Sequence, residues 1–232
     1  LVTDPEFIAV VIRSLVFAAL AVTLTIMIAL AIALWIHQLR GWLALVVQIF
    51  IVLPWVVSQV VGMLLFRWVF VNDIGLGIYA LELLGFAGFR PLASATTAMM
   101  VLVLFACWRT LGFAMLLLLA GLKSIPEDLY EAAHVDGASA WQRFLHITVP
   151  MLKTPVLITL VMLTVSNLNN VEAPLIVTGG GPADATNIVS LDLYNRAFAR
   201  FDFNTAIALG IGMFAANILL AIAYVRLVKR NG

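Results

Sequence analysis

Five long runs of apolar residues constrain this chain more than any other feature of its sequence. A helix needs about 20 apolar residues to cross the roughly 30 Å hydrocarbon layer of a membrane. Runs of this kind cover residues 14–36, 42–66, 92–119, 154–177 and 205–228. The sequence therefore predicts an all-α fold, a polytopic membrane helix bundle with five spans.

The composition indicates lipid rather than water as the solvent. Of 232 residues, 64% are hydrophobic and 11% are charged, whereas a soluble domain has roughly 45–50% and about 25%. The net charge of +1 provides no basic surface for nucleic acid. The single cysteine, Cys107, cannot form an internal disulfide or a cysteine-based zinc site. We therefore expect a membrane protein that binds no nucleic acid, metal ion or cofactor of its own.

The basic residues beside the spans predict how the chain crosses the membrane, because cytoplasmic loops carry an excess of Lys and Arg. If the turn at Arg40 is cytoplasmic, that side also holds Lys123, Arg143, Lys153, Arg226, Lys229 and Arg230, and the opposite side holds Arg13, Arg67, Arg90, Arg196 and Arg200. The bias is strongest where Lys229 and Arg230 follow the last apolar run. We therefore expect an extracytoplasmic N-terminus and a cytoplasmic C-terminus.

The stretch 121–150 is the most polar part of the chain and is predicted to leave the membrane as a loop. Ser124 and Glu127 have the spacing of a capping box, which predicts that a short helix begins there. That helix should end where Gly137 can adopt the left-handed conformation. A second short helix is predicted over 139–147, ending before the proline that follows. The loop should thus contain two short helices joined by a sharp corner.

This loop also resembles that of a known family. Glu131-Ala132-Ala133, Gly137 and Ile147-Thr148-Val149-Pro150 have the spacing of the EAA loop in permease subunits of bacterial binding-protein-dependent ABC importers, with valine in place of the usual leucine. The resemblance implies that 1–232 is one transmembrane permease domain and that 121–150 is a cytoplasmic coupling loop that docks on an ATPase. The residues implied in coupling are Glu131, Ala132, Ala133, Asp136 and Gly137.

Longer stretches resemble the sugar-importer branch of this family. Residues 124–139 look like the loop of sugar importers, with the sequence Ser-Ile-Pro-Glu-Asp-Leu-Tyr-Glu-Ala-Ala-His-Val-Asp-Gly-Ala-Ser. Residues 50–57 also look like a stretch of this branch. Residues 175–182, Leu-Ile-Val-Thr-Gly-Gly-Gly-Pro, are similar to the maltose-type permease that pairs with a second, different permease. Relatives usually carry a further membrane helix before the segment that corresponds to 4–7. A full chain is therefore expected to have six spans.

The resemblance also implies partners. With the second permease, the chain would form a heterodimeric pathway in a bacterial cytoplasmic membrane, coupled to two copies of a cytoplasmic ATPase and supplied by an extracytoplasmic solute-binding protein. The cargo would be a di- or oligosaccharide of trehalose or maltose type. ATP and Mg²⁺ would bind to the ATPase, because Gly121-Leu122-Lys123-Ser124 lacks two glycines that a Walker A loop requires. We therefore expect a transport subunit and not an enzyme.

Polar side chains inside a span usually face a cavity or a partner, because their burial in lipid is costly. Arg109, Thr110 and Phe113 lie within one helical turn and offer a cation, a hydroxyl and an aromatic ring, which suit a sugar. A second group has the i, i+3, i+4, i+7 spacing of one helix face: Leu163, Ser166, Asn167 and Asn170. The resemblance implies that maltose-type permeases bind sugar at positions matching both groups.

Other interpretations stay open. Arg109 could snorkel to the surface or bond to backbone carbonyls at the interface with the second permease, and the asparagines could join neighbouring helices. A permease for glycerol phosphate would use Arg109 to attract an anion. A secondary transporter would show inverted halves and a buried acid-base relay, whereas the sequence shows no such symmetry and no acid within a span except Glu172 near a span end. A purely structural subunit would need neither Arg109 nor Asn167 for uptake.

Overall fold

The structure is a computed structural model that describes residues 5–39, 41–71, 75–86 and 88–230. The helices in these ranges are α1 (Pro5–Gln38), α2 (Trp42–Val56), α3 (Gln59–Val69), α4 (Leu76–Leu83), α5 (Ala95–Lys123), α6 (Glu127–Val135), α7 (Ala140–Arg143), α8 (Val149–Met151), α9 (Lys153–Leu168), α10 (Val189–Tyr194) and α11 (Phe203–Arg230). Three further segments are π-helical: Phe144–Thr148, Pro174–Thr178 and Asn195–Ala199. The prediction of an all-α fold is confirmed.

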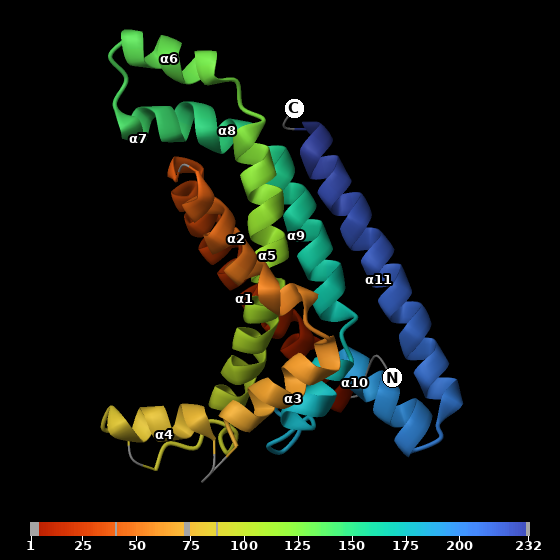
Figure 1. The fold of residues 1–232 in the computed structure, drawn as a ribbon. Coiled ribbons are helices and arrows are strands. Elements are labelled where there is room, and N and C mark those ends of the chain that lie inside the picture. Colours follow the sequence, from red (N-terminus) through yellow and green to blue (C-terminus); the bar gives the residue numbers. More distant parts are fainter. Residues whose placement is uncertain (1–4, 40, 72–74, 87, 231–232) are drawn as a thin grey trace.

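The long helices form a bundle of membrane-spanning length. α1, α5 and the Phe203–Tyr224 part of α11 are each long and apolar enough to cross a membrane. Two bent pairs also qualify, α2 with α3 at 96° and Ala140–Met151 with α9 at 57°. There are thus up to five spans if each bent pair counts as one. Figure 1 shows α6 and the C-terminus at one end of the bundle and the N-terminus, α3 and α4 at the other.

α5 is the central helix, because α1, α2 and α9 all pack against it. Its buried side chains form two apolar clusters, one shared with α1 and one shared with both α1 and α9. Gly112 allows α2 to approach closely: a Cβ at this position would lie 2.5 Å from the Ile51 carbonyl oxygen. Small residues at helix contacts are typical of membrane bundles, where backbones gain van der Waals packing by approaching each other.

The second apolar run is not one straight span. α2 ends at Val56, and α3 leaves at 96°. Pro54 lies in the last turn of α2, where it lacks an amide hydrogen and crowds the preceding turn. The carbonyl oxygens of Pro54 and Trp55 accept hydrogen bonds from the Arg109 guanidinium instead, that of Pro54 at 2.6 Å. Residues 42–66, predicted as one span, therefore form two helices.

The fourth apolar run also breaks. The sequence predicts one span over 154–177, which is wrong because α9 ends at Leu168. Asparagines at this point compete with the backbone for hydrogen bonds. Asn169 Nδ2 donates to a carbonyl one turn earlier at 2.7 Å, and Asn170 Oδ1 accepts from the Ala173 amide at 2.8 Å. Asn170 thereby starts the separate helical turn that leads into the second π-helical segment.

The predicted start of the polar loop is wrong. α5 continues through Gly121 to Lys123, and Gly121 packs closely against Pro155 of α9. The Ser124 hydroxyl donates to the carbonyl of Gly121 at 2.8 Å and therefore does not cap the next helix. Pro126 occupies the N-cap position of α6 without a side-chain hydrogen bond. The expected capping box at Ser124 is absent.

The predicted end of the second short helix is also wrong. Instead of stopping before Pro150, the chain continues through the π-helical segment Phe144–Thr148 and α8 to Met151. Pro150 lies in the first turn of α8.

A buried ion pair stabilises the end of the bundle opposite α6. Arg196 Nε lies 2.7 Å from Asp192 Oδ2, and the Asp192 side chain is 4% exposed. The hydrogen bond with Asp192 raises the pKa of Arg196, so the guanidinium stays charged. Hydrogen bonds from Thr205 lower the pKa of Asp202, whose carboxylate accepts from the Thr205 amide at the start of α11.

Gly112→Ala should lower the free energy of unfolding by about 1–3 kcal/mol, because the new Cβ would meet the backbone of α2. The thermal unfolding midpoint of the purified protein in detergent measures this effect. Gly210→Ala in α11 is the control, since its Cβ would lie 3.7 Å from Leu193 Cδ1, an ordinary contact. Equal midpoints for the two variants would contradict the close approach of α2 to α5.

Candidate functional site

The corner between α6 and α7 is defined by backbone geometry. Gly137 lies there with a φ of +77°. The Gly137 amide donates to the His134 carbonyl at 3.1 Å, and the Ala138 amide donates to the Ala133 carbonyl at 2.9 Å. These two hydrogen bonds form a Schellman motif, which satisfies the last carbonyls of α6. The corner therefore lies where the sequence predicts it.

A capping box follows this corner directly. The Ser139 amide donates to Gln142 Oε1 at 2.8 Å, and the Gln142 amide donates to Ser139 Oγ at 3.3 Å. Sequence reasoning placed this motif at Ser124, although the Ser-x-x-Gln spacing at 139–142 is the signal that identifies it. Because only Ala138 separates the corner glycine from the capping box, hydrogen bonds on both sides set the angle. We call residues 124–151 the elbow.

The outer surface of the elbow is exposed and partly apolar. Among the residues predicted to couple to an ATPase, Ala133 is half-buried, and the exposed ones are Glu131, Ala132, Asp136 and Gly137. Val135 is 86% exposed and Trp141 is 65% exposed. Large apolar side chains in a water-facing position commonly mark an interaction surface. The elbow therefore presents apolar area and a carboxylate to a partner.

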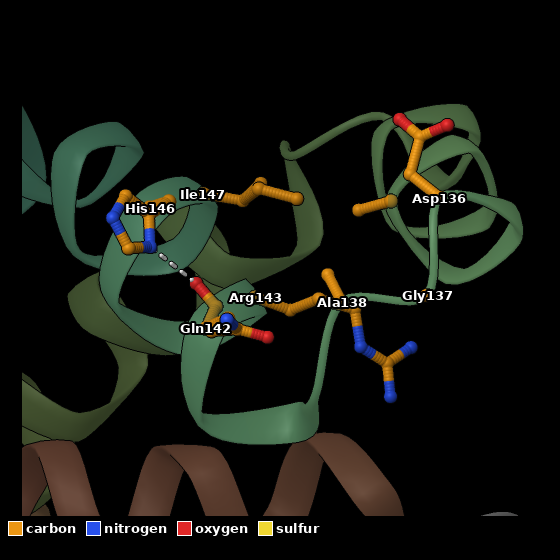
Figure 2. Close-up of a pocket in the computed structure, with 8 residues that line it drawn as sticks. Asp136, Gly137, Ala138, Gln142, Arg143, His146 and Ile147 are labelled. Carbon is orange, nitrogen blue, oxygen red and sulfur yellow. Dashed lines mark hydrogen bonds between the residues drawn. The ribbon is translucent and has the colours of Figure 1, made fainter.

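A cavity of about 320 Å³ lies inside the corner. Figure 2 shows Asp136 and Gly137 on one side of it and His146 on the other. His146 Nδ1 is hydrogen-bonded to the Gln142 carbonyl oxygen at 2.9 Å. The small residue Ala138 also lines the cavity. The corner therefore leaves room for a side chain of a docking protein.

The inner side of the elbow is attached to the spans. The Tyr130 and Thr148 hydroxyls form a hydrogen bond of 2.8 Å, which joins α6 to the π-helical segment before α8. Ile125 and Leu152 are buried in the apolar cluster formed by α1, α5 and α9. The elbow is thus a packed extension of α5 and α9 rather than a free loop. Nothing in the sequence pattern predicts the contact between Tyr130 and Thr148.

The first predicted cargo group faces the break after α2. Arg109 donates to the last carbonyls of α2, while its Nε is buried without a hydrogen-bond partner. The Thr110 hydroxyl donates to a carbonyl one turn earlier at 2.8 Å. Phe113 stacks on Trp55 with ring centroids 5.3 Å apart. Arg109 therefore bonds to backbone carbonyls of its own chain in this structure, and the Thr110 hydroxyl is likewise bonded to the backbone.

The second predicted cargo group is divided between core and surface. Leu163 is 1% exposed and Asn167 is 4% exposed, with Asn167 Nδ2 donating to the Leu163 carbonyl at 2.9 Å. Ser166 is exposed and Asn170 is half-buried. α9 packs on α5, yet in the described ranges no hydrogen bond joins the two groups. Binding of cargo by these residues stays a prediction.

Amide side chains also join helices, as the sequence analysis left open. Asn217 Nδ2 of α11 donates to Asn169 Oδ1 at the end of α9 at 3.0 Å. The Thr164 and Tyr224 hydroxyls form a second contact between these helices at 3.3 Å. The asparagine that links two helices is therefore Asn169, which lies outside the predicted face that contains Asn167 and Asn170.

Comparison with known proteins identifies the family. Residues 21–232 match the family described as binding-protein-dependent transport system inner membrane component. The sulfoquinovosyl glycerol transport system permease protein SmoG of Agrobacterium fabrum is 33% identical over 77% of this chain and 58% of its own length. The trehalose/maltose transport system permease protein MalF of Thermococcus litoralis is 32% identical over 90% of this chain and 70% of its own. The sn-glycerol-3-phosphate transport system permease protein UgpA of Yersinia pestis is 31% identical over 98% of this chain and 77% of its own.

This chain thus spans less than two thirds of the length of SmoG. Its fold is similar to that in the crystal structure of a bacterial alginate ABC transporter in complex with alginate pentasaccharide-bound periplasmic protein, with a TM-score of 0.88 over 99% of this chain and 81% of the other, at 22% identity. The resemblance noted in the loop is confirmed. The chain belongs to the family of binding-protein-dependent transport system inner membrane components, the permease subunits of ABC importers.

Proposed function

We propose that this chain forms one half of the translocation pathway of an ATP-driven sugar importer. The observation that carries the proposal is the elbow, in which a Schellman motif and a capping box hold two short helices at a fixed angle beyond the spans. Its exposed helix face suits insertion into a groove of another protein. Membership of the family supports a cytoplasmic ATPase as that protein.

The position of the elbow in the chain supports a mechanical role. It begins where α5 ends and finishes where α9 begins, so a displacement of the elbow moves both helices. These are the helices that carry the predicted cargo residues. In the proposed cycle, ATP-driven closure of the ATPases moves the elbow, the two permeases rock to open the pathway outward, and hydrolysis resets them. The bend before α9 is a place where the chain can change its angle.

The other parts of the importer are separate chains in this proposal. They are a second permease, two copies of a cytoplasmic ATPase that bind ATP and Mg²⁺, and an extracytoplasmic solute-binding protein. Only 11% of the apolar window of α11 is buried, compared with 56% for α5. This exposure supports further contacts of α11 within the membrane. The elbow and C-terminus face the cytoplasm, and the N-terminus faces the opposite side.

The proposed cargo is a neutral di- or oligosaccharide of trehalose or maltose type. The names of the relatives MalF and SmoG support a sugar. The partly exposed side chains of Thr110, Phe113 and Asn170 offer hydrogen bonds and an aromatic face. The relative UgpA favours glycerol phosphate as the second candidate. Arg109 would then attract the anion.

Gly137→Val should abolish most cargo-stimulated ATP hydrolysis in the importer reconstituted with its partners. No atom lies within 4 Å of a Cβ at Gly137, so the loss would come from about 1–2 kcal/mol of strain in the left-handed backbone. Gly137→Asn is the matched control, because asparagine tolerates this conformation, and should retain most of the activity. Hydrolysis by the valine variant at the wild-type level would exclude the corner from coupling.

Vesicles that contain the complete importer should accumulate labelled trehalose or maltose only when ATP is supplied on the elbow side. An excess of glycerol 3-phosphate should not inhibit this uptake, because the proposed site recognises neutral hydroxyls. Uptake of glycerol 3-phosphate without uptake of either sugar would instead assign the anionic cargo. Accumulation by the two permeases without the ATPase would refute ATP coupling.

A further inference from the structure

A second cavity lies on the inner side of the elbow, and its volume is about 570 Å³. It is open to the surface and is lined by segments that are distant in the sequence. His37 lines it from the end of α1, Lys123 from the end of α5, and Tyr130 and Arg143 from the elbow. Neither the coupling surface nor the predicted cargo groups account for this cavity.

The charges in this cavity are unbalanced. Lys123 and Arg143 are cationic, and Glu127 is the acid in the lining. No ion pair or hydrogen bond connects Glu127 to Lys123 or Arg143 within the described residues. The cavity therefore has a net positive charge that the protein does not neutralise.

Arg143 also has an unused hydrogen-bond donor. Its Nε is buried and makes no hydrogen bond. A buried donor without an acceptor costs about 1–3 kcal/mol, and a guanidinium group cannot lose its charge in a protein. Arg143 lines both this cavity and the corner cavity, and Figure 2, which draws the corner cavity, shows its guanidinium extending past Ala138. Its planar fork matches a group that has two adjacent oxygen atoms.

The cavity lies where the spans end. Lys123 is the last residue of α5, and His37 lies in the last turn of α1. The negative ends of the two helices favour basic residues at these positions. That effect does not explain Arg143, because α7 continues directly into the π-helical segment and Arg143 is not at a free helix end.

We propose that this cavity binds a phosphate group through Arg143 and Lys123. The phosphate belongs either to the headgroup of an anionic phospholipid or to a soluble phosphate compound, because both present the same oxygens to the guanidinium. Basic pockets at the cytoplasmic ends of spans are suited to anionic headgroups. The proposal takes from the proposed function only that the elbow end is cytoplasmic, and it does not depend on the cargo.

The test uses the complete importer purified from vesicles of equal parts phosphatidylglycerol and phosphatidylcholine. Native mass spectrometry measures the phosphatidylglycerol that the protein retains. Arg143→Gln should weaken retention about tenfold or more, because a charged hydrogen bond is lost. Lys123→Gln, at the exposed mouth of the cavity, should also weaken retention without disturbing the elbow. Arg200→Gln, at the opposite end of the bundle, is the control and should retain the lipid.

A second arm distinguishes the sources of the phosphate. Inorganic phosphate is titrated into the importer in phosphatidylcholine alone, and the thermal unfolding midpoint is recorded. A rise in the wild type that Arg143→Gln removes, without selective retention of phosphatidylglycerol, assigns a soluble phosphate. Equal lipid retention and equal phosphate response in wild type, Arg143→Gln and Lys123→Gln overturn the proposal. Retention is measured without transport, so a failure of the proposed function would appear separately, as lost uptake with the lipid still bound.

Discussion

Inside a bilayer, every backbone amide and carbonyl has to find its hydrogen-bond partner within the protein. The continuous helices α1, α5 and α11 satisfy most of this demand by themselves, but α2 and α9 end within apolar runs. Arg109 supplies donors to the carbonyls at the end of α2, and Asn169 and Asn170 bond to the backbone around the end of α9. These polar side chains therefore lie where α2 and α9 end, close to the positions at which we propose that cargo binds.

The backbone amides and carbonyls of the elbow are also paired by hydrogen bonds, and these bonds hold the corner between its two short helices. The Schellman bonds close α6, and the capping box at Ser139 opens α7 after a single intervening residue. The Tyr130–Thr148 hydrogen bond and the burial of Ile125 then fix the elbow on the spans. A stiff attachment matters for coupling, because a flexible loop would absorb a displacement instead of transmitting it.

α5 connects the different parts of the proposed mechanism. It packs against three other helices, carries Arg109 and leads directly into the elbow. The close contact at Gly112 holds it against α2, and Arg109 bonds to the broken end of that helix. A movement of α5 would therefore carry the end of α2 with it, which links the pathway to the elbow through packing and hydrogen bonds.

Composition within short windows determined part of this protein: the apolar runs set the helical class, and Gly137 set the corner. Tertiary structure alone decided the rest. Arg109 finds its acceptors 54 and 55 residues away, and Leu163 is buried while Ser166, predicted to share its face, is exposed. Gly121 of α5 packs against Pro155 of α9, a contact between segments far apart in the sequence. Such outcomes depend on which distant segments meet, and local periodicity does not contain that information.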